Sequence, residues 1–241
     1  MELYKEDLKW CLRRLPRPVF EMMKKHPGDI FLAGGFIRAC IANEKPCDVD
    51  LFTTNKEKAK LYAELFAVDG KIIETDNAFT IIGKIKPPIQ IIHKWVFEKP
   101  EDILPSFDFT IARAVIWYHG AWKGICDDRF YIDLAAKRLT YCSPKRIEYV
   151  GGSLLRVLKF YQRGYRIPLN YLAAVIARLM TGIRPDAIES MTEPQDLEEK
   201  WAFVITGLLH EVDPQVDLTH EAHLPSTVED ITEESLGNII R

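Results

Sequence analysis

The sequence predicts an α+β fold, with a sheet-containing first part and an all-helical second part. Short apolar runs separated by Gly, Pro, Asn and Asp recur up to residue 126, as in strands joined by turns. From Pro144 onward the apolar residues recur at helical spacing instead. We therefore expect two domains, with bounds 1–142 and 143–241.

Helices and strands are both expected in the first domain. Residues 4–25 predict two short helices, because Pro16 and Pro18 interrupt the helical pattern. Residues 55–67 predict a helix with Asn55 as its N-cap and with Leu61, Leu65 and Phe66 facing inward. The other elements are strands at 30–33, 48–52, 71–75, 78–85 and 89–96, a hairpin that turns at His119-Gly120, and a helix at 129–139.

The second domain is expected to contain helices only, at 145–149, 153–163, 169–180 and 196–209. Its first part is basic, because only Glu148 is acidic before Asp186. Aromatic residues interleave with these cations, a composition that suits a nucleotide or an RNA strand, although a solvated helix face would have the same charges. The basic residues are Lys145, Arg146, Arg156, Lys159, Arg163, Arg166, Arg178 and Arg184. The last thirty or so residues are acidic and predict a loosely packed appendage.

Composition excludes several classes of protein. The net charge of −3 and the hydrophobic content of 47% are typical of a globular protein. No run approaches the length of about 18 apolar residues that a membrane span needs. The N-terminal ten residues contain no apolar signal segment, so we expect a cytoplasmic protein. Its five scattered cysteines, which form no CxxC pair, are expected to be reduced thiols.

The stretch from Phe31 to Phe52 carries the chemistry. Asp48 and Asp50 lie two residues apart on a predicted strand, so their side chains share one face, about 6–7 Å apart along the backbone. Carboxylate oxygens are the ligands that Mg²⁺ and Mn²⁺ prefer, so the pair predicts a metal site. Alternatively, the two carboxylates are only a polar sheet edge.

A glycine pair precedes the two aspartates. Gly34 and Gly35 join a strand to a helix, where backbone N–H groups can approach a phosphate. Arg38, one helical turn later, could bind phosphates by charge-assisted hydrogen bonds. A phosphate site beside a metal site predicts phosphoryl or nucleotidyl transfer. Alternatively, the glycines form only a turn.

Four segments in order resemble the head domain of the class II CCA-adding enzymes and bacterial poly(A) polymerases, in the polymerase-beta nucleotidyltransferase superfamily. They are AGGFIRACIANEKPCDVDLF, FDFTIARAV, ICDDRFYIDLAAKRLTY and SLLRVLKFYQRGY. The resemblance implies a mixed or antiparallel sheet of about five strands with flanking helices, followed by a helical neck. It also implies an enzyme that transfers a nucleoside monophosphate from an NTP to an acceptor hydroxyl, such as an RNA or tRNA 3′ end.

The resemblance assigns roles to ten residues. Asp48 and Asp50 would hold Mg²⁺ or Mn²⁺, and Asp108 would join them as a catalytic residue. The nucleotide-binding residues would be Gly34, Gly35 and Arg38 for the triphosphate, Thr110 and Arg113 for the sugar side, and Arg156 and Lys159 for the base or phosphates. The acceptor could also be a protein or a small molecule.

The chain departs from the family pattern at several positions. Gln90 stands where a third carboxylate is expected, and Ser106 and Phe107 stand where paired arginines precede Asp108. The neck lacks most of the residues that select C and A, so templated CCA addition is not expected. Gln90 above all leaves an alternative hypothesis open beside the enzyme, in which the chain is a non-catalytic nucleotide- or RNA-binding module derived from such an enzyme.

Overall fold

The computed structural model describes residues 1–68, 70–144 and 150–212. The chain divides into two compact units, Met1–Ala136 with Cys142–Lys145, and Lys137–Tyr141 with Arg146–Arg241. Each unit has its own core. The predicted helix at 145–149 and the acidic C-terminal segment lie outside the described residues. Within the described ranges, none of the helices has the length and apolar character needed to cross a bilayer.

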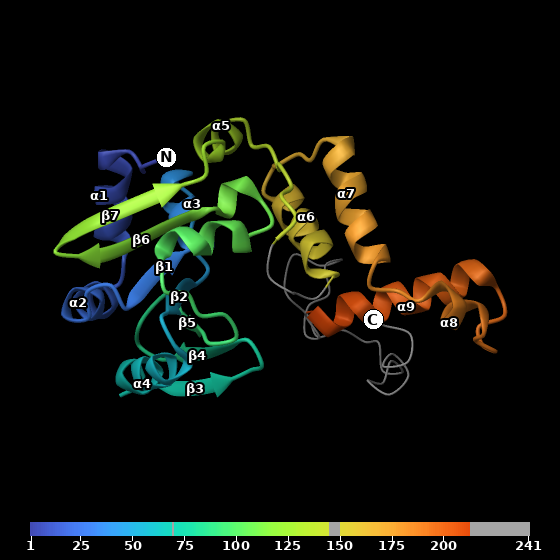
Figure 1. Ribbon diagram of the computed structural model, residues 1–241, viewed down its shortest axis with the longest axis horizontal. Coiled ribbons are helices and arrows are strands. Elements are labelled where there is room, and N and C mark those ends of the chain that lie inside the picture. The colour runs from blue at the N-terminus through green and yellow to red at the C-terminus, as the bar shows by residue number, and fades with distance from the viewer. Residues whose placement is uncertain (69, 145–149, 213–241) are drawn as a thin grey trace. The chain divides into compact units, whose positions relative to one another are not determined.

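A mixed sheet of seven strands forms the centre of the first unit, in the order β3-β4-β5-β2-β1-β6-β7 (Figure 1). The implied sheet of about five strands is therefore wrong in its strand number. Strand β5 pairs with β2 in parallel, and the other neighbours pair antiparallel. The strands are β1 (Ile30–Ala33), β2 (Val49–Thr53), β3 (Lys71–Glu74), β4 (Ala78–Ile82), β5 (Ile89–Ile92), β6 (Ala114–His119) and β7 (Ala121–Cys126).

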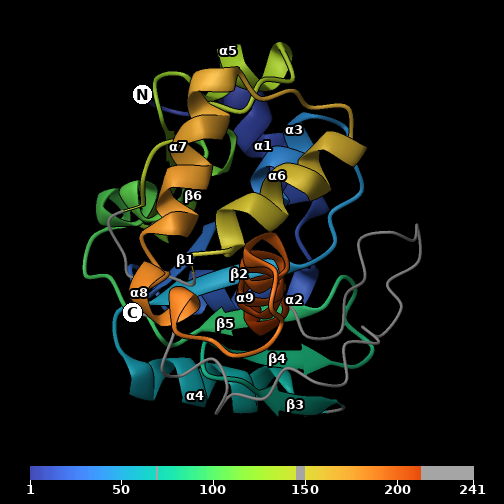
Figure 2. The same cartoon turned by 90° about the vertical axis from the view of Figure 1, so that its right-hand side faces the viewer.

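In the described part of the first unit, five α-helices and two 3₁₀ segments accompany this sheet. Figures 1 and 2 both show α4 alongside β3 and β4, and α1 packs against α3. The helices are α1 (Lys5–Arg14), α2 (Arg17–Lys25), α3 (Gly35–Ile41), α4 (Lys56–Phe66) and α5 (Phe130–Ala135). The 3₁₀ segments are η1 (Pro100–Ser106) and η2 (Thr110–Ala112).

Helix α4 starts as the sequence predicts but buries a different face. Asn55 caps it, because its side chain accepts a hydrogen bond of 2.8 Å from the Lys58 backbone N–H. Leu61 and Leu65 are 48% and 44% exposed, so their predicted inward orientation is wrong. The buried positions are Ala59, Tyr62, Ala63 and Phe66. The two small alanines let the helix approach the sheet closely and turn both leucines toward solvent.

The second unit is helical in its described part. Its core consists of Leu179, Ile183, Ile188, Val204 and Leu208. The helices are α6 (Gly152–Gln162), α7 (Leu169–Met180), α8 (Pro185–Glu189) and α9 (Leu197–Val212). Three of them match the predicted helices, and α8 is an addition that begins at Pro185.

Candidate functional site

Asp50 lies on the central strand β2. The sheet face that carries Asp50 is polar near this residue and apolar farther along the strands. Its strand neighbours Val49 and Leu51 point to the opposite face and are 0% and 1% exposed, which confirms the predicted alternation. Further along the Asp50 face, 3₁₀ segment η1 covers a cluster of Phe31, Ala33, Phe52, Ile103, Val115 and Trp117. Asp50 itself is half-buried at the end of this cluster, and Asp48 lies two residues earlier, just before β2 begins.

The turn between β1 and α3 approaches Asp50 closely. Gly34 has φ 77° and ψ −137°, a conformation that side chains rarely adopt, and it caps helix α3. A Cβ atom at this position would lie 3.4 Å from Asp50 Oδ2 and 3.1 Å from the Phe107 ring. A Cβ on Gly35 would meet no atom within 4 Å. Gly34 is therefore the glycine that both the backbone and the surroundings require.

Phe107 borders the site. From the sequence alone, it is only a residue that replaces an arginine of the family pattern. Its ring lies edge-on to Phe52, with 6.0 Å between ring centroids, and against Gly34. Its carbonyl accepts a hydrogen bond of 3.0 Å from Arg113 Nε. The position directly before Asp108 thus contributes an aromatic ring beside Asp50 rather than a positive charge.

Gln90 lies next to Asp50 on the parallel strand β5. The two residues are in register, so their side chains lie on the same sheet face. Gln90 therefore lies beside Asp50, which the sequence predicts as a metal ligand. Both side chains are half-buried.

The donor set fits one divalent cation bound together with an NTP. Mg²⁺ in nucleotide sites is held by one or two carboxylates, and phosphate oxygens and water complete its shell. Asp48 and Asp50 would supply two carboxylates, and a Cβ at Gly34 would lie in contact with Asp50, 3.4 Å from its Oδ2. Among the described residues, His, Cys, Asp and Glu side chains form no group of three that could hold a metal.

Arg38 lies on α3 but is buried, with its side chain 4% exposed. Its guanidinium forms an ion pair with the carboxylate of Glu44, which follows in the loop after the helix. Glu44 thus neutralises the buried positive charge of Arg38. The spacing of residues in the sequence does not indicate that Arg38 is buried or that Glu44 is its partner.

Residues 108–113 form hydrogen bonds and an ion pair with residues from later segments of the chain. Asp108 is 3% exposed, and its carbonyl accepts a hydrogen bond of 2.7 Å from the Cys142 N–H. The Thr110 hydroxyl donates a 2.7 Å hydrogen bond to Asp133. Arg113 Nη1 lies 3.6 Å from an Asp127 carboxylate oxygen. The roles of Asp108, Thr110 and Arg113 toward a nucleotide stay predictions.

Arg156 and Lys159 lie on α6 of the second unit, where both are half-buried. Their predicted contacts with the base or the phosphates of a nucleotide also stay predictions.

His93, near the end of β5, is packed in the interior. It is 7% exposed, its Nε2 lies 3.0 Å from the Thr75 carbonyl and its ring packs on Phe79.

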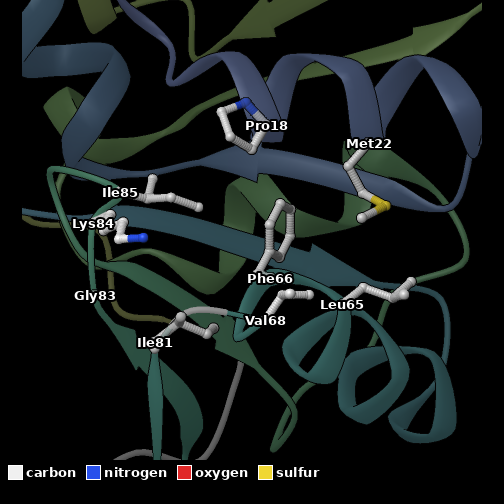
Figure 3. A pocket seen from close by; sticks show the side chains of 10 residues that line it. Pro18, Met22, Leu65, Phe66, Val68, Ile81, Gly83, Lys84 and Ile85 are labelled. Carbon is white, nitrogen blue, oxygen red and sulfur yellow. The ribbon is translucent and has the colours of Figure 1, made fainter.

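A separate cavity of about 290 Å³ opens between α2, the end of α4 and the loop after β4 (Figure 3). It lies on the sheet face opposite Asp50, because Ile81 in its wall pairs with Ile89, which pairs with Val49. Figure 3 shows Met22, Phe66 and Ile81 among the side chains around it. Lys84 is the charged residue of a lining that is otherwise apolar, which does not suit a triphosphate.

A model of the Gabija anti-defense 2 family matches residues 2–137 of the chain, more than half of its length. The chain belongs to the Gabija anti-defense 2 family. A comparison with curated proteins gives no match.

Solved structures of CCA-adding enzymes have a fold similar to that of this Gabija anti-defense 2 family member. A Thermotoga maritima CCA-adding enzyme in complex with tRNA matches with a TM-score of 0.52 and 18% identity, covering 82% of this chain and 53% of that one. CCA-adding enzyme complexes with CTP and with ATP match with TM-scores of 0.53, at 19% and 18% identity, each covering 82% of this chain and 50% of the other.

The chain thus spans about half the length of the CCA-adding enzymes that it matches. At this identity the similarity concerns the fold alone. The resemblance predicted from sequence is therefore confirmed as a nucleotidyltransferase-like fold.

Proposed function

We propose that this Gabija anti-defense 2 family protein is a metal-dependent nucleotidyltransferase. It moves a nucleoside monophosphate from an NTP to an acceptor hydroxyl, releases pyrophosphate and thereby serves the counter-defence role that the family description names. The observation that supports the proposal most is the convergence of the Gly34 turn and the Asp50 carboxylate in a fold similar to that of CCA-adding enzymes.

The proposed site combines charge and backbone groups on one face of the sheet. Asp48 and Asp50 would hold Mg²⁺ or Mn²⁺, which neutralises charge on the triphosphate when bound. The Gly34-Gly35 turn, through the backbone N–H of Gly35, and the side chain of Arg38 bind the phosphates. The Gly34 N–H itself donates a hydrogen bond of 3.3 Å to the Ala114 carbonyl. We assign residues 1–142 to the nucleotidyltransferase head and residues 143–241 to the helical neck and C-terminal region.

The proposal also gives a role to each of the remaining predicted residues. Asp108 belongs to the catalytic carboxylates, and Thr110 and Arg113 belong to the sugar side. Arg156 and Lys159 interact with the base or the phosphates. The aromatic ring of Phe107 lies against Gly34 and gives the site an apolar surface near Asp50.

The transfer itself is a substitution at the α-phosphorus of the NTP. The acceptor oxygen forms a bond to this phosphorus, and the bond to the bridging oxygen of the β-phosphate breaks. Pyrophosphate leaves with that electron pair, and the acceptor's proton passes to a carboxylate of the site or to water. The residues of this chain position the two reactants in line and hold the charge of the phosphates.

An RNA 3′ end is the acceptor that the basic residues of α6 favour. Neighbouring structures contain tRNA, CTP and ATP, which supports NTP and RNA as partners. We place the reaction in the cytoplasm, where NTPs and RNA are available.

The test is transfer of label from α-³²P-NTPs in Mg²⁺ or Mn²⁺, with total tRNA and with protein from Gabija-carrying cells as acceptors. We expect label on an acceptor with the intact chain and none with the Asp48→Ala/Asp50→Ala variant. Glu98→Ala, which changes an exposed acid outside the site, is the matched control and should transfer normally.

A second candidate function is NTP or RNA binding without turnover. Gln90 favours it, because an amide replaces the expected carboxylate beside Asp50. Binding of NTP without transfer to RNA or protein would support this candidate and overturn the enzyme.

A further inference from the structure

One row of residues crosses the sheet at the level of Asp50. In register from β4 to β6 it consists of Thr80, Gln90, Asp50, Ala33 and Val115. Residues in one row of a sheet point to the same face. The row therefore fixes which neighbouring side chains can share a ligand with Asp50.

The neighbours of Asp50 in this row are all uncharged. Ala33 and Val115 are both 0% exposed and offer no side-chain oxygen. On the other side, Gln90 and Thr80 are half-buried and offer an amide and a hydroxyl. The row thus has one carboxylate, and Asp48, directly before β2, contributes another. Asp108 adds no third ligand to this pair, because the described His, Cys, Asp and Glu side chains form no group of three that could hold a metal.

This charge count suits one divalent cation better than two. Two-metal sites hold their ions about 3.5–4 Å apart, where shared carboxylates must offset a strong repulsion. An amide oxygen can ligate a cation through its dipole, but it adds no negative charge. Two carboxylates therefore balance the charge of one Mg²⁺, and a second ion would depend on the phosphates alone.

We infer that the site binds one divalent cation for each bound NTP, and that Gln90 is the residue that limits it to one. The inference rests on the proposed function, because it takes Asp48 and Asp50 as ligands of the cation that accompanies the NTP. With one cation at the NTP, no second metal ion activates the acceptor hydroxyl, so this activation depends on the protein's own side chains. Gln90 then affects turnover rather than nucleotide binding.

The test counts metal ions in the full chain. Equilibrium dialysis with Mn²⁺ and α,β-methylene-ATP or α,β-methylene-CTP, which cannot transfer their nucleotide, gives bound metal and bound nucleotide together. Electron paramagnetic resonance of the same samples detects a spin-coupled pair of Mn²⁺ ions, so the readout does not depend on activity. We expect one Mn²⁺ per bound nucleotide and no coupled pair.

Two variants of Gln90 form the comparison. Gln90→Glu adds a negative charge with almost the same shape, so it should raise the count to two ions and produce the coupled signal. Gln90→Met removes the polar group without adding charge and should leave the count at one. Circular dichroism and thermal unfolding establish that both variants are folded.

The outcomes distinguish a failure of the inference from a failure of the proposed function. Two Mn²⁺ ions per nucleotide in the unchanged chain would overturn the inference and leave the proposed function standing, as would a folded Gln90→Glu variant that still binds one. Failure of the unchanged chain to bind either analogue would overturn both. The count in the unchanged chain is decisive even if Gln90→Glu does not fold.

Discussion

The hydroxyl of Thr110 donates a hydrogen bond of 2.7 Å to the carboxylate of Asp133, and the two side chains are 1% and 0% exposed. Arg129 reaches the same carboxylate from one helical turn earlier, with an Nη2–Oδ1 distance of 3.2 Å. Asp133 therefore joins the 3₁₀ segment η2 to helix α5.

Replacing Asp133 with Ala should destabilise the chain by about 2–3 kcal/mol, because the buried Thr110 hydroxyl loses its acceptor. Urea unfolding monitored by fluorescence measures this change. The Asp133→Asn variant keeps an acceptor oxygen and should lose less. In a double-mutant cycle with Thr110→Val, the two effects should couple by about 1 kcal/mol. Strict additivity would contradict the proposed contact.

Tyr62 gives the fold a dependence on alkaline pH. It is 2% exposed, and its hydroxyl lies 3.4 Å from Asp29 Oδ2. Burial, together with the neighbouring Asp29 charge, raises the pKa of Tyr62 from 10 to about 12. Below pH 10 the hydroxyl is protonated in both states. Between pH 10 and pH 12 the unfolded chain loses the proton first, so the free energy of unfolding falls as pH rises.

By pH 11 a contribution on the order of 1 kcal/mol should be lost, because the pH then lies about one unit above the pKa of the unfolded chain. Tyr62→Phe removes this contribution while keeping the ring. We therefore expect the difference in unfolding free energy between the unchanged chain and Tyr62→Phe to shrink between pH 9 and pH 11. A difference that stays constant over this range would show that Tyr62 titrates normally in the folded state.

The sequence predicts most helices and strands of this fold because each depends on residues that are close together in the chain. The Asn55 cap, the turn at His119-Gly120 and the alternation around Asp50 each depend on neighbours within a few residues. The strand segments identified along the chain also number seven. The wrong strand number comes from the family resemblance, which implies a smaller sheet.

Long-range contacts account for what the sequence does not predict. The inward face of α4 is ambiguous, because alanines and leucines both count as apolar, and only packing against the sheet decides between them. The Arg38–Glu44 ion pair depends on the path of the loop after α3. The contact between Phe107 and Gly34 joins segments more than seventy residues apart and has no local signal.

The ion pair of Arg38 leads to a test of its phosphate role. Because its guanidinium is buried and paired with Glu44, Arg38→Met should destabilise the chain by about 3 kcal/mol. The Glu44→Gln variant retains Arg38 but lacks the carboxylate that neutralises the charge of its guanidinium. If Arg38 binds the triphosphate, Glu44→Gln should therefore bind α,β-methylene-ATP several-fold more tightly, measured by isothermal titration calorimetry. Unchanged or weaker binding in a folded Glu44→Gln variant would assign Arg38 a structural role only.

The two adjacent glycines provide a matched pair of variants. Gly34→Ala should destabilise the chain by about 3 kcal/mol, because alanine disfavours φ 77° and its Cβ would lie 3.1 Å from the Phe107 ring. Gly35→Ala should be neutral or stabilising by up to about 1 kcal/mol, because Gly35 begins helix α3 and has open space around it. Urea unfolding of both variants gives the comparison.

A third variant separates the two causes of the Gly34→Ala effect. In Gly34→Ala/Phe107→Ala the ring is absent, so the steric part of the loss disappears while the backbone part persists. The double variant should therefore lose less than the sum of the two single losses. The Cβ of Gly34→Ala also lies 3.4 Å from Asp50 Oδ2, so nucleotide binding should stay weak even without the ring. Equal losses for Gly34→Ala and Gly35→Ala would show that this turn is not the special conformation that the site depends on.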